Sequence, residues 1–278
     1  MTCDMMGCVT LTLLDQLTQS SVLSSVAATQ KLIDEFLLLP VIRRPSAATA
    51  VVIAQLRESS ALGSAELSGI ALPAHASDAV RGDGSPMAMQ REVVDALVAA
   101  AVADADMFMT SPPRALARWH MIATAGLHLP DASRGRPRLA DEPVFNDPLN
   151  CSIAAAPVDV TMTSLLKLAL DRSLPALVVA SALHALVAHS QPFNAANALL
   201  ARTAARAALV ARASDPDGLI PVERAIADAG RSKYVQQLRG CIVNGVITVQ
   251  WWEWQMHMVA AAVERATMIA RRDSASQV

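Results

Sequence analysis

Apolar residues recur along most of the chain at steps of three and four residues, the spacing of a helix that packs on one side. No long run alternates strictly between apolar and polar residues, as strands do. The pattern therefore predicts an all-α fold, with looser Gly- and Pro-containing stretches at 63–86 and 127–160. The predicted helices cover residues 10–38, 46–62, 88–105, 113–126, 162–170, 174–189, 196–213, 221–229, 231–243 and 248–271.

Composition supports a helical protein with a large core. Of the 278 residues, 53% are hydrophobic and 3% are aromatic, with the helix formers Ala and Leu among the most abundant. The net charge of −2 at pH 7 gives no broad positive surface, so nucleic acid is not an expected partner. The four cysteines lack metal-ligand spacing, so we expect reduced thiols and no metal site; they are Cys3, Cys8, Cys151 and Cys241.

The most apolar part of the chain is too short to cross a bilayer. This run, residues 174–188, has fewer than 18 residues and contains His184, which predicts a buried core helix and no membrane association. The first residues lack the cationic start and the cleavage site of a signal peptide. The expected location is the cytoplasm.

The chemistry-bearing pattern lies between two predicted helices. Residues 191–202 read Gln-Pro-Phe-Asn-Ala-Ala-Asn-Ala-Leu-Leu-Ala-Arg. We call this stretch the signature loop, because it resembles the loop His-Pro-Phe-x-Asp/Glu-Gly-Asn-Gly-Arg-x-x-Arg of the Fic (Fido) family. The Pro-Phe pair, the Asn and the last Arg are present. The His, the acidic residue, both Gly and the first Arg are replaced.

The resemblance implies a fold, an ancestral activity and a set of ligands. Fic proteins are all-α and mainly transfer AMP from ATP to a protein hydroxyl, with Mg²⁺ on the phosphates. The resemblance thus implies a Fic-like domain at 88–270 after an N-terminal helical extension at 1–87, with a frayed tail at 271–278. It implies ATP and Mg²⁺ as ligands and a protein target or regulatory protein as partner. The chain is most similar to diverged bacterial Fic-like proteins of actinobacteria.

Three replaced positions argue against ordinary AMP transfer. The family's catalytic His, a general base, corresponds to Gln191, and an amide cannot accept a proton at neutral pH. The metal-holding acidic position is Ala195, which offers no oxygen to Mg²⁺. The first phosphate-binding Arg corresponds to Leu199, which has no guanidinium. We therefore expect an impaired enzyme, a pseudoenzyme for AMPylation.

Other residues of the signature loop keep the family's identity. Phe193, Asn197 and Arg202 match, and the resemblance assigns them to nucleotide or phosphate binding, with Phe193 alternatively a core side chain. Arg206, one turn after Arg202, could add a second cation. Both arginines could instead form structural ion pairs with acidic neighbours, and the two interpretations stay open. His189 is a weaker alternative base, two residues before the aligned position.

Two segments outside the loop also resemble family elements. The sequence Gly-Arg-Pro-Arg, residues 135–138, lies where Fic proteins have the flap that aligns the target chain, with Arg136, Pro137 and Arg138 as candidate target contacts. This flap is either a solvated loop or a surface for an acidic peptide or a phosphate. Residues 64–69 fit the inhibitory pattern Ser/Thr-x-x-x-Glu-Gly/Asn, with Ser68 at the Glu position.

Three functions remain open at this stage. The leading hypothesis is an impaired Fic-like protein that binds a partner or a nucleotide. The first alternative is an active transferase of a phosphate-containing group with a non-standard base such as His189. The second is a structural or regulatory helical protein that acts by interaction alone. The sequence makes no prediction of the oligomeric state.

Overall fold

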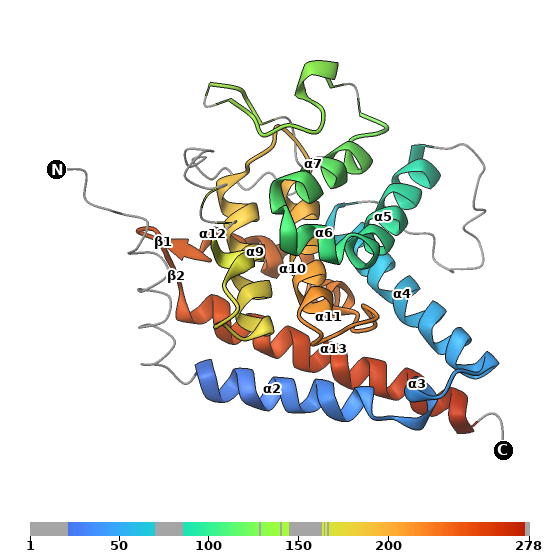
Figure 1. Cartoon of the computed structure of the whole chain (residues 1–278). Helices are drawn as coiled ribbons and strands as arrows, with labels where there is room; N and C mark the ends of the chain where they lie inside the picture. The colour runs from blue at the N-terminus through green and yellow to red at the C-terminus, as the bar shows by residue number, and fades with distance from the viewer. Residues whose placement is uncertain are drawn as a thin grey trace.

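Nearly all regular structure in the described part of the chain is helical (Figure 1), and the predicted all-α fold is confirmed. A computed structural model describes residues 22–69, 86–127, 129–139, 141–144, 163, 165 and 167–275. Its α-helices are α2 (Val22–Leu37), α3 (Pro40–Arg43), α4 (Ala47–Leu67), α5 (Pro86–Ala103), α6 (Ala105–Thr110), α7 (Pro112–Ala123), α9 (Ala176–Ser190), α10 (Asn197–Ala211), α11 (Val222–Asp228), α12 (Arg231–Arg239) and α13 (Val249–Ala275).

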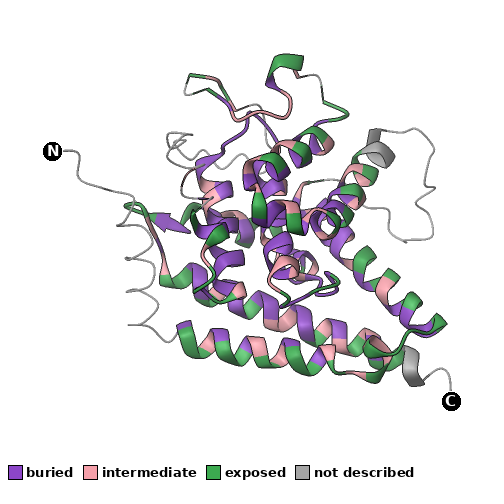
Figure 2. Ribbon diagram, in the orientation of Figure 1, coloured by how far each residue is buried: buried purple, intermediate pink, exposed green. Residues whose placement is uncertain are grey.

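Helix α9 lies at the centre, and α10 packs along it. Apolar residues occupy every face of α9, as expected of a helix surrounded by protein, and almost all of its residues are buried (Figure 2). Small side chains let the two helices approach closely, among them Ala180, Ala201, Ala204 and Ala208, all buried. This pairing fixes the two ends between which the signature loop runs.

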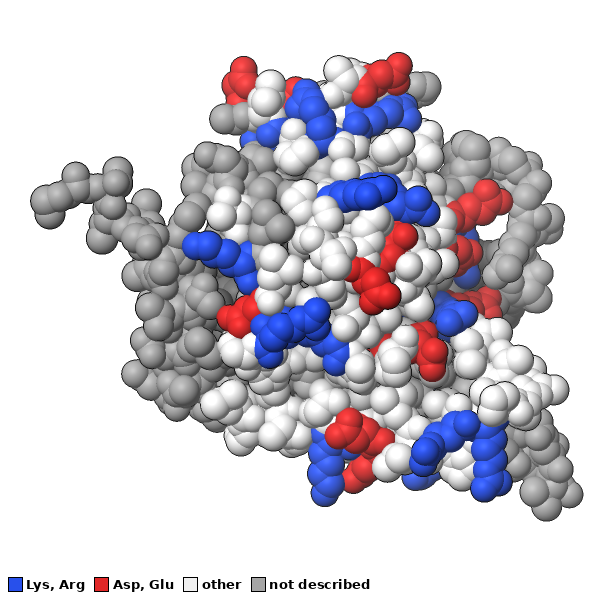
Figure 3. Space-filling view, in the orientation of Figure 1, with Lys and Arg blue, Asp and Glu red and all other residues white. Residues whose placement is uncertain are grey.

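The outer helices cover this centre from several sides. Helix α13 is the longest, and α2 lies beside it along the lower edge of the molecule in Figure 1. Helix α4 crosses α11, where Gly63 leaves no room for a side chain against the backbone of Glu223 and Arg224. Charges of both signs are scattered over the face seen in Figure 3. Among the described residues, no helix is long and apolar enough to cross a membrane.

Several predicted helix boundaries were wrong. Helix α4 continues to Leu67, past Gly63, and α13 continues to Ala275, so helix covers residues 271–275 of the predicted tail. The helix predicted at 231–243 ends at Arg239, and a hairpin follows, β1 (Ile242–Val243) paired antiparallel with β2 (Val246–Ile247). Asn244 and Gly245 at its tip have φ values of 52° and 78°, as a two-residue hairpin turn requires.

Some sequence predictions lie outside the described residues. Residues 10–21 of the first predicted helix belong here, as do Cys3, Cys8 and Cys151. Of the predicted helix at 162–170, residues 163, 165 and 167–170 are described and are helical. Cys241 is a buried thiol whose Sγ donates to the carbonyl of Ala185 at 3.9 Å.

Candidate functional site

The signature loop leaves α9 and enters α10 through two residues with left-handed backbone. Gln191, directly after α9, has φ 46°, and its N–H donates to the carbonyl of Val187 at 3.2 Å. Ala196, directly before α10, has φ 59°. The family has Gly at position 196, and a non-Gly residue in this conformation costs about 1 kcal/mol. The turn is thus retained without its glycine.

The side chain of Asn197 holds this turn closed. Its Oδ1 accepts a hydrogen bond from the backbone N–H of Phe193 at 2.9 Å, and its Nδ2 donates to the carbonyl of Phe193 at 2.8 Å. Both ends of the carboxamide therefore bind the loop's own backbone, and Asn197 is almost completely buried. The structure brings Asn197 and Phe193 together as parts of one clasp.

His120 of α7 connects the loop to the flap. The Phe193 ring is fully buried and stacks on the His120 ring, with centroids 4.6 Å apart and planes 23° apart. Nδ1 of His120 accepts a hydrogen bond from the N–H of Gly135 at 3.0 Å. Burial lowers the pKa of His120 to about 4, against the opposing hydrogen bond of Asn194. His120 is therefore neutral at pH 7, with its proton on Nε2 because Nδ1 accepts.

His120 is not among the site residues predicted from the sequence, although its helix carries a usable signal. The buried residues Leu116, Trp119, His120 and Ala123 recur at steps of three, one and three, the inward stripe of a helix. A histidine on such a stripe is expected to find a polar partner, because a buried ring nitrogen without one is costly. Only the folded chain shows that this partner belongs to the flap.

The flap folds back onto the signature loop. The N–H of Arg138 donates to the carbonyl of Pro192 at 2.9 Å, and its Nε donates to the carbonyl of Gln191 at 2.8 Å. Arg138 is buried. Of the two interpretations of the flap, a solvated loop does not describe Arg138. Its guanidinium anchors the flap to the loop and does not project outward as a target contact.

The other flap residues are engaged locally. Arg136 donates from Nη1 to Glu142 at 2.8 Å, and its Nη2 contacts the second oxygen of the same carboxylate. The hydrogen bond from Arg136 is the main reason that the pKa of Glu142 falls to about 2. Pro137 is half-buried, and its carbonyl accepts from Arg136 Nη1 at 3.0 Å.

The candidate bases lie at the end of α9. Gln191 is buried at the base position, and its carbonyl is the acceptor for Arg138. His189 is half-buried in the last turn of α9, where burial lowers its pKa, and its Nδ1 has no hydrogen-bond partner among the described residues. In the described part of the chain, no three His, Cys, Asp or Glu residues are placed to hold a metal ion.

Apolar side chains surround the first phosphate-binding position. Leu199 packs against a cluster formed by Ala61 and Ala65 of α4 and by Val94 and Val98 of α5. We call these five residues the apolar plug. A phosphate beside the plug would lose hydration without gaining a donor from Leu199, which is unfavourable for a charged group. The plug also joins α10 to α4 and α5.

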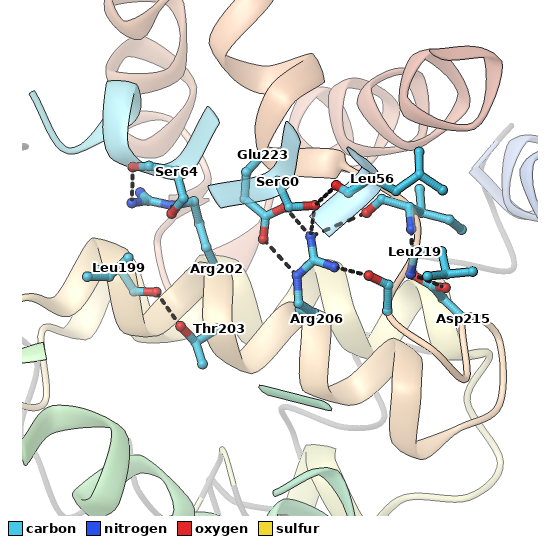
Figure 4. Close-up of polar contacts among 12 residues, drawn as sticks. Leu56, Ser60, Ser64, Leu199, Arg202, Thr203, Arg206, Asp215, Leu219 and Glu223 are labelled. Carbon is cyan, nitrogen blue, oxygen red and sulfur yellow. Dashed lines mark hydrogen bonds and ion pairs between the residues drawn. The ribbon is translucent and has the colours of Figure 1, made fainter. Parts of the chain in front are cut away.

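Arg202 is buried against α4 (Figure 4), with 2% of its surface exposed. Its Nε donates to the hydroxyl of Ser64 at 3.0 Å, and its Nη2 donates to the carbonyl of Ser64 at 3.1 Å and to the hydroxyl of Ser68 at 2.7 Å. The structure thus brings the last Arg of the loop to Ser68, the position that the resemblance gives to the inhibitory Glu. Glu66 instead pairs with Arg224 at 2.9 Å.

Arg206 forms a structural ion pair. Its Nε donates to Glu223 at 3.1 Å and its Nη2 contacts the other carboxylate oxygen, while Nη1 donates to the carbonyl of Gly218 at 2.7 Å (Figure 4). Both side chains are buried. Burial alone would lower the pKa of Arg206, but the charge and hydrogen bonding of Glu223, together with the charge of Asp215, outweigh it, and the pKa is raised. The guanidinium is therefore committed to Glu223.

Comparison with known proteins identifies the architecture. No protein-family model and no curated protein matches the chain. Among solved structures it is similar to a Fic family protein from Desulfovibrio desulfuricans G20, with 18% identity, a TM-score of 0.66 and coverage of 89% of this chain and 74% of that chain. It is also similar to Fic-1 from C. elegans, with 14% identity, a TM-score of 0.60 and coverage of 95% and 74%. The chain has the Fic fold, as the signature loop predicted.

Proposed function

We propose that this Fic-fold protein has lost efficient AMP transfer and acts by binding a protein partner. The observation that carries the proposal is the apolar plug, in which Leu199 replaces a phosphate-binding Arg and packs against α4 and α5. Closure of such a position by close-packed apolar atoms is hard to reverse during a catalytic cycle, because reopening it would expose apolar surface to water.

The replaced side chains support the same conclusion. Loss of a general base costs about 10²- to 10⁴-fold in rate, and Gln191 has no protonation change to offer near neutral pH. Ala195 is buried and has no side-chain oxygen for Mg²⁺. Arg202 already donates to three oxygen sites on α4, so a phosphate would have to displace those hydrogen bonds.

Apolar side chains around the flap support binding of a partner. Met121, Leu127 and Leu139 are exposed by 58%, 41% and 59% of their surface. Met121 lies against Gly135 and the carbonyl of Leu127 accepts from Arg134, so both adjoin the flap, and Leu139 directly follows flap residues 135–138 in the chain. Charges of both signs are interspersed over the face in Figure 3, so an apolar contact suits this region better than recognition of a strongly acidic or basic peptide.

Labelled ATP provides the test of lost transfer. Purified protein incubated with a host lysate and ATP labelled on the α-phosphate should leave no label on protein, with Gln191→His giving the same result because positions 195 and 199 stay unsuited. In a calorimetric titration, the heat released on adding ATP should be the same with and without Mg²⁺. Labelling by the unaltered protein would establish the active-transferase alternative instead.

Partner binding needs a separate test. A protein recovered with the unaltered chain should be lost when Met121→Glu and Leu139→Glu are combined, since both charges would be desolvated in an apolar contact. Leu170→Glu, at another exposed leucine, is the matched control and should retain the partner. Equal recovery with both variants would contradict the assignment of this surface.

A further inference from the structure

A small cavity lies between α9, α10, α11 and α13, and Arg202 is the one residue of the signature loop that lines it. Its volume is about 30 Å³, and none of residues 191–197 lines it. Its polar lining consists of Ser181, His184, Arg202, Arg206, Asp215, Glu223 and Gln255. A space of 10–15 Å³ already holds a water, whereas pockets for nucleotide-sized ligands occupy about 300–1,000 Å³. The cavity therefore fits a single small ion or molecule.

Arg202 presents an unused donor to this cavity. Its Nη1 is buried and has no hydrogen-bond partner among the described residues. Nε and Nη2 form the edge that faces Ser64, so Nη1 lies on the opposite edge of the planar guanidinium. Ser64 does not line this cavity, whereas Arg202 does. The free donor therefore points to the cavity side.

Arg202 also lacks a counter-charge of its own. Its hydrogen-bond acceptors are two hydroxyls and a carbonyl, and the Tyr234 ring lies 5.8 Å from its Cζ atom. None of the ion pairs formed among the described residues includes Arg202, since Glu66 pairs with Arg224 and Glu223 pairs with Arg206. An uncompensated buried charge is costly, and a bound ion of opposite sign would offset that cost.

The acidic side chains of the lining are turned toward other donors. Asp215 accepts from the N–H groups of Leu219 and Ile220 at 2.8 and 2.9 Å, and both oxygens of Glu223 contact Arg206. His184 is neutral, because burial and then the charge of Arg202 lower its pKa to about 3. Nδ1 of His184 accepts a hydrogen bond from Nε2 of Gln255 at 3.3 Å. The same Nε2 carries a second N–H group that remains as a donor. All four carboxylate oxygens of the lining thus already accept hydrogen bonds from groups of the protein.

We propose that this cavity binds a monovalent anion of the size of chloride, held by Nη1 of Arg202. The rest of its wall is apolar and includes Leu177, Ile226 and Val259, which disfavours a strongly hydrated polyanion. The ion neutralises the buried guanidinium and ties α10 to α9 and α13. The inference does not depend on the proposed function, because none of the replaced positions 191, 195 and 199 that support that function lines this cavity.

Thermal unfolding in matched salts tests the site. At equal ionic strength, about 0.1 M chloride or bromide should raise the Tm by about 2–4 °C relative to gluconate, which is too large to enter. Arg202→Met, which keeps the length of the side chain and removes the charge, should abolish the difference. Arg118→Met, at an exposed arginine, should retain it.

Each outcome decides the proposal. An unaltered protein with the same Tm in both salts, or an Arg202→Met variant that keeps the halide response, overturns it. If Arg202→Met does not fold, crystals of the unaltered protein grown in bromide decide instead. An anomalous peak within hydrogen-bond distance of Arg202 Nη1 supports the site, and a water or no peak at that position overturns it.

Discussion

Nη2 of Arg202 donates a hydrogen bond to the hydroxyl of Ser68 at 2.7 Å and so joins the helix after the signature loop to the C-terminal end of α4. The Ser68 hydroxyl donates in turn to the carbonyl of Ser64 at 2.9 Å. The contact links residues 134 positions apart in the chain. It places the neutral hydroxyl of Ser68 where a carboxylate would pair with the buried guanidinium of Arg202.

Ser68→Glu should stabilise the protein. A charge-assisted hydrogen bond to Arg202 contributes about 1.5–3 kcal/mol, whereas a carboxylate at the C-terminal end of α4 costs about 0.3–1 kcal/mol. We expect a net gain on the order of 1 kcal/mol in the free energy of unfolding, measured by urea denaturation. Ser68→Gln is the uncharged control and should give no gain. A gain that persists in the Arg202→Met background would contradict the pairing.

Glu223→Gln should be strongly destabilising. Removing one partner of a buried ion pair leaves Arg206 uncompensated, at a cost of about 3–5 kcal/mol. Glu66→Gln breaks the more exposed pair with Arg224 and should cost less than about 1 kcal/mol. Equal losses in chemical denaturation would show that burial does not distinguish the two pairs.

Gly63→Ala should weaken the crossing of α4 and α11. A Cβ at this position would lie 2.4 Å from the N atom and 2.5 Å from the Cα atom of Arg224, and backbone atoms cannot rotate away. The helices must separate, and overpacking of this kind costs about 1–3 kcal/mol. Gly126→Ala, where a Cβ meets nothing within 4 Å, is the matched control. A Tm unchanged by Gly63→Ala would refute the close approach.

Stability should fall as the pH is lowered from 7 toward 4. Burial lowers the pKa of His184 to about 3 and that of His120 to about 4, each from 6.5. Below pH 6.5 the unfolded chain therefore binds protons that the folded chain does not bind. Each histidine contributes up to about 1.4 kcal/mol per pH unit to the slope of the unfolding free energy against pH. His184→Gln should reduce the slope of the unfolding free energy by about one proton. An unchanged slope would show that His184 is protonated in the folded state.

The sequence predicted the fold well, because both of its signals are local. Helical periodicity and the match at Pro192, Phe193, Asn197 and Arg202 are read within one or two turns of chain. The hairpin at Asn244 and Gly245 was also readable, since this dipeptide favours its turn. Apolar residues continue at helical spacing past Arg239, and for this reason the helix was predicted to extend to residue 243.

The candidate site could not be predicted to the same depth. Whether Arg202 and Arg206 bind phosphate or protein depends on Ser64 and Glu223, which lie 138 and 17 residues away. Likewise, Arg138 reaches the signature loop across 53 residues. Such partners are set by how the helices cross, and pattern along the chain does not encode that geometry directly. The partners of these arginines could therefore be identified only from the structure.

The clasp between Asn197 and Phe193 makes the path of the loop independent of the side chains around it. Its hydrogen bonds run from one carboxamide to the backbone N–H and carbonyl of a single residue, so neither end requires a particular residue at positions 191, 195 or 199. Substitutions at those positions therefore leave the hydrogen bonds that hold the turn intact. The same independence makes the loop a template for engineering, in which new side chains can be introduced on a backbone that already holds its shape.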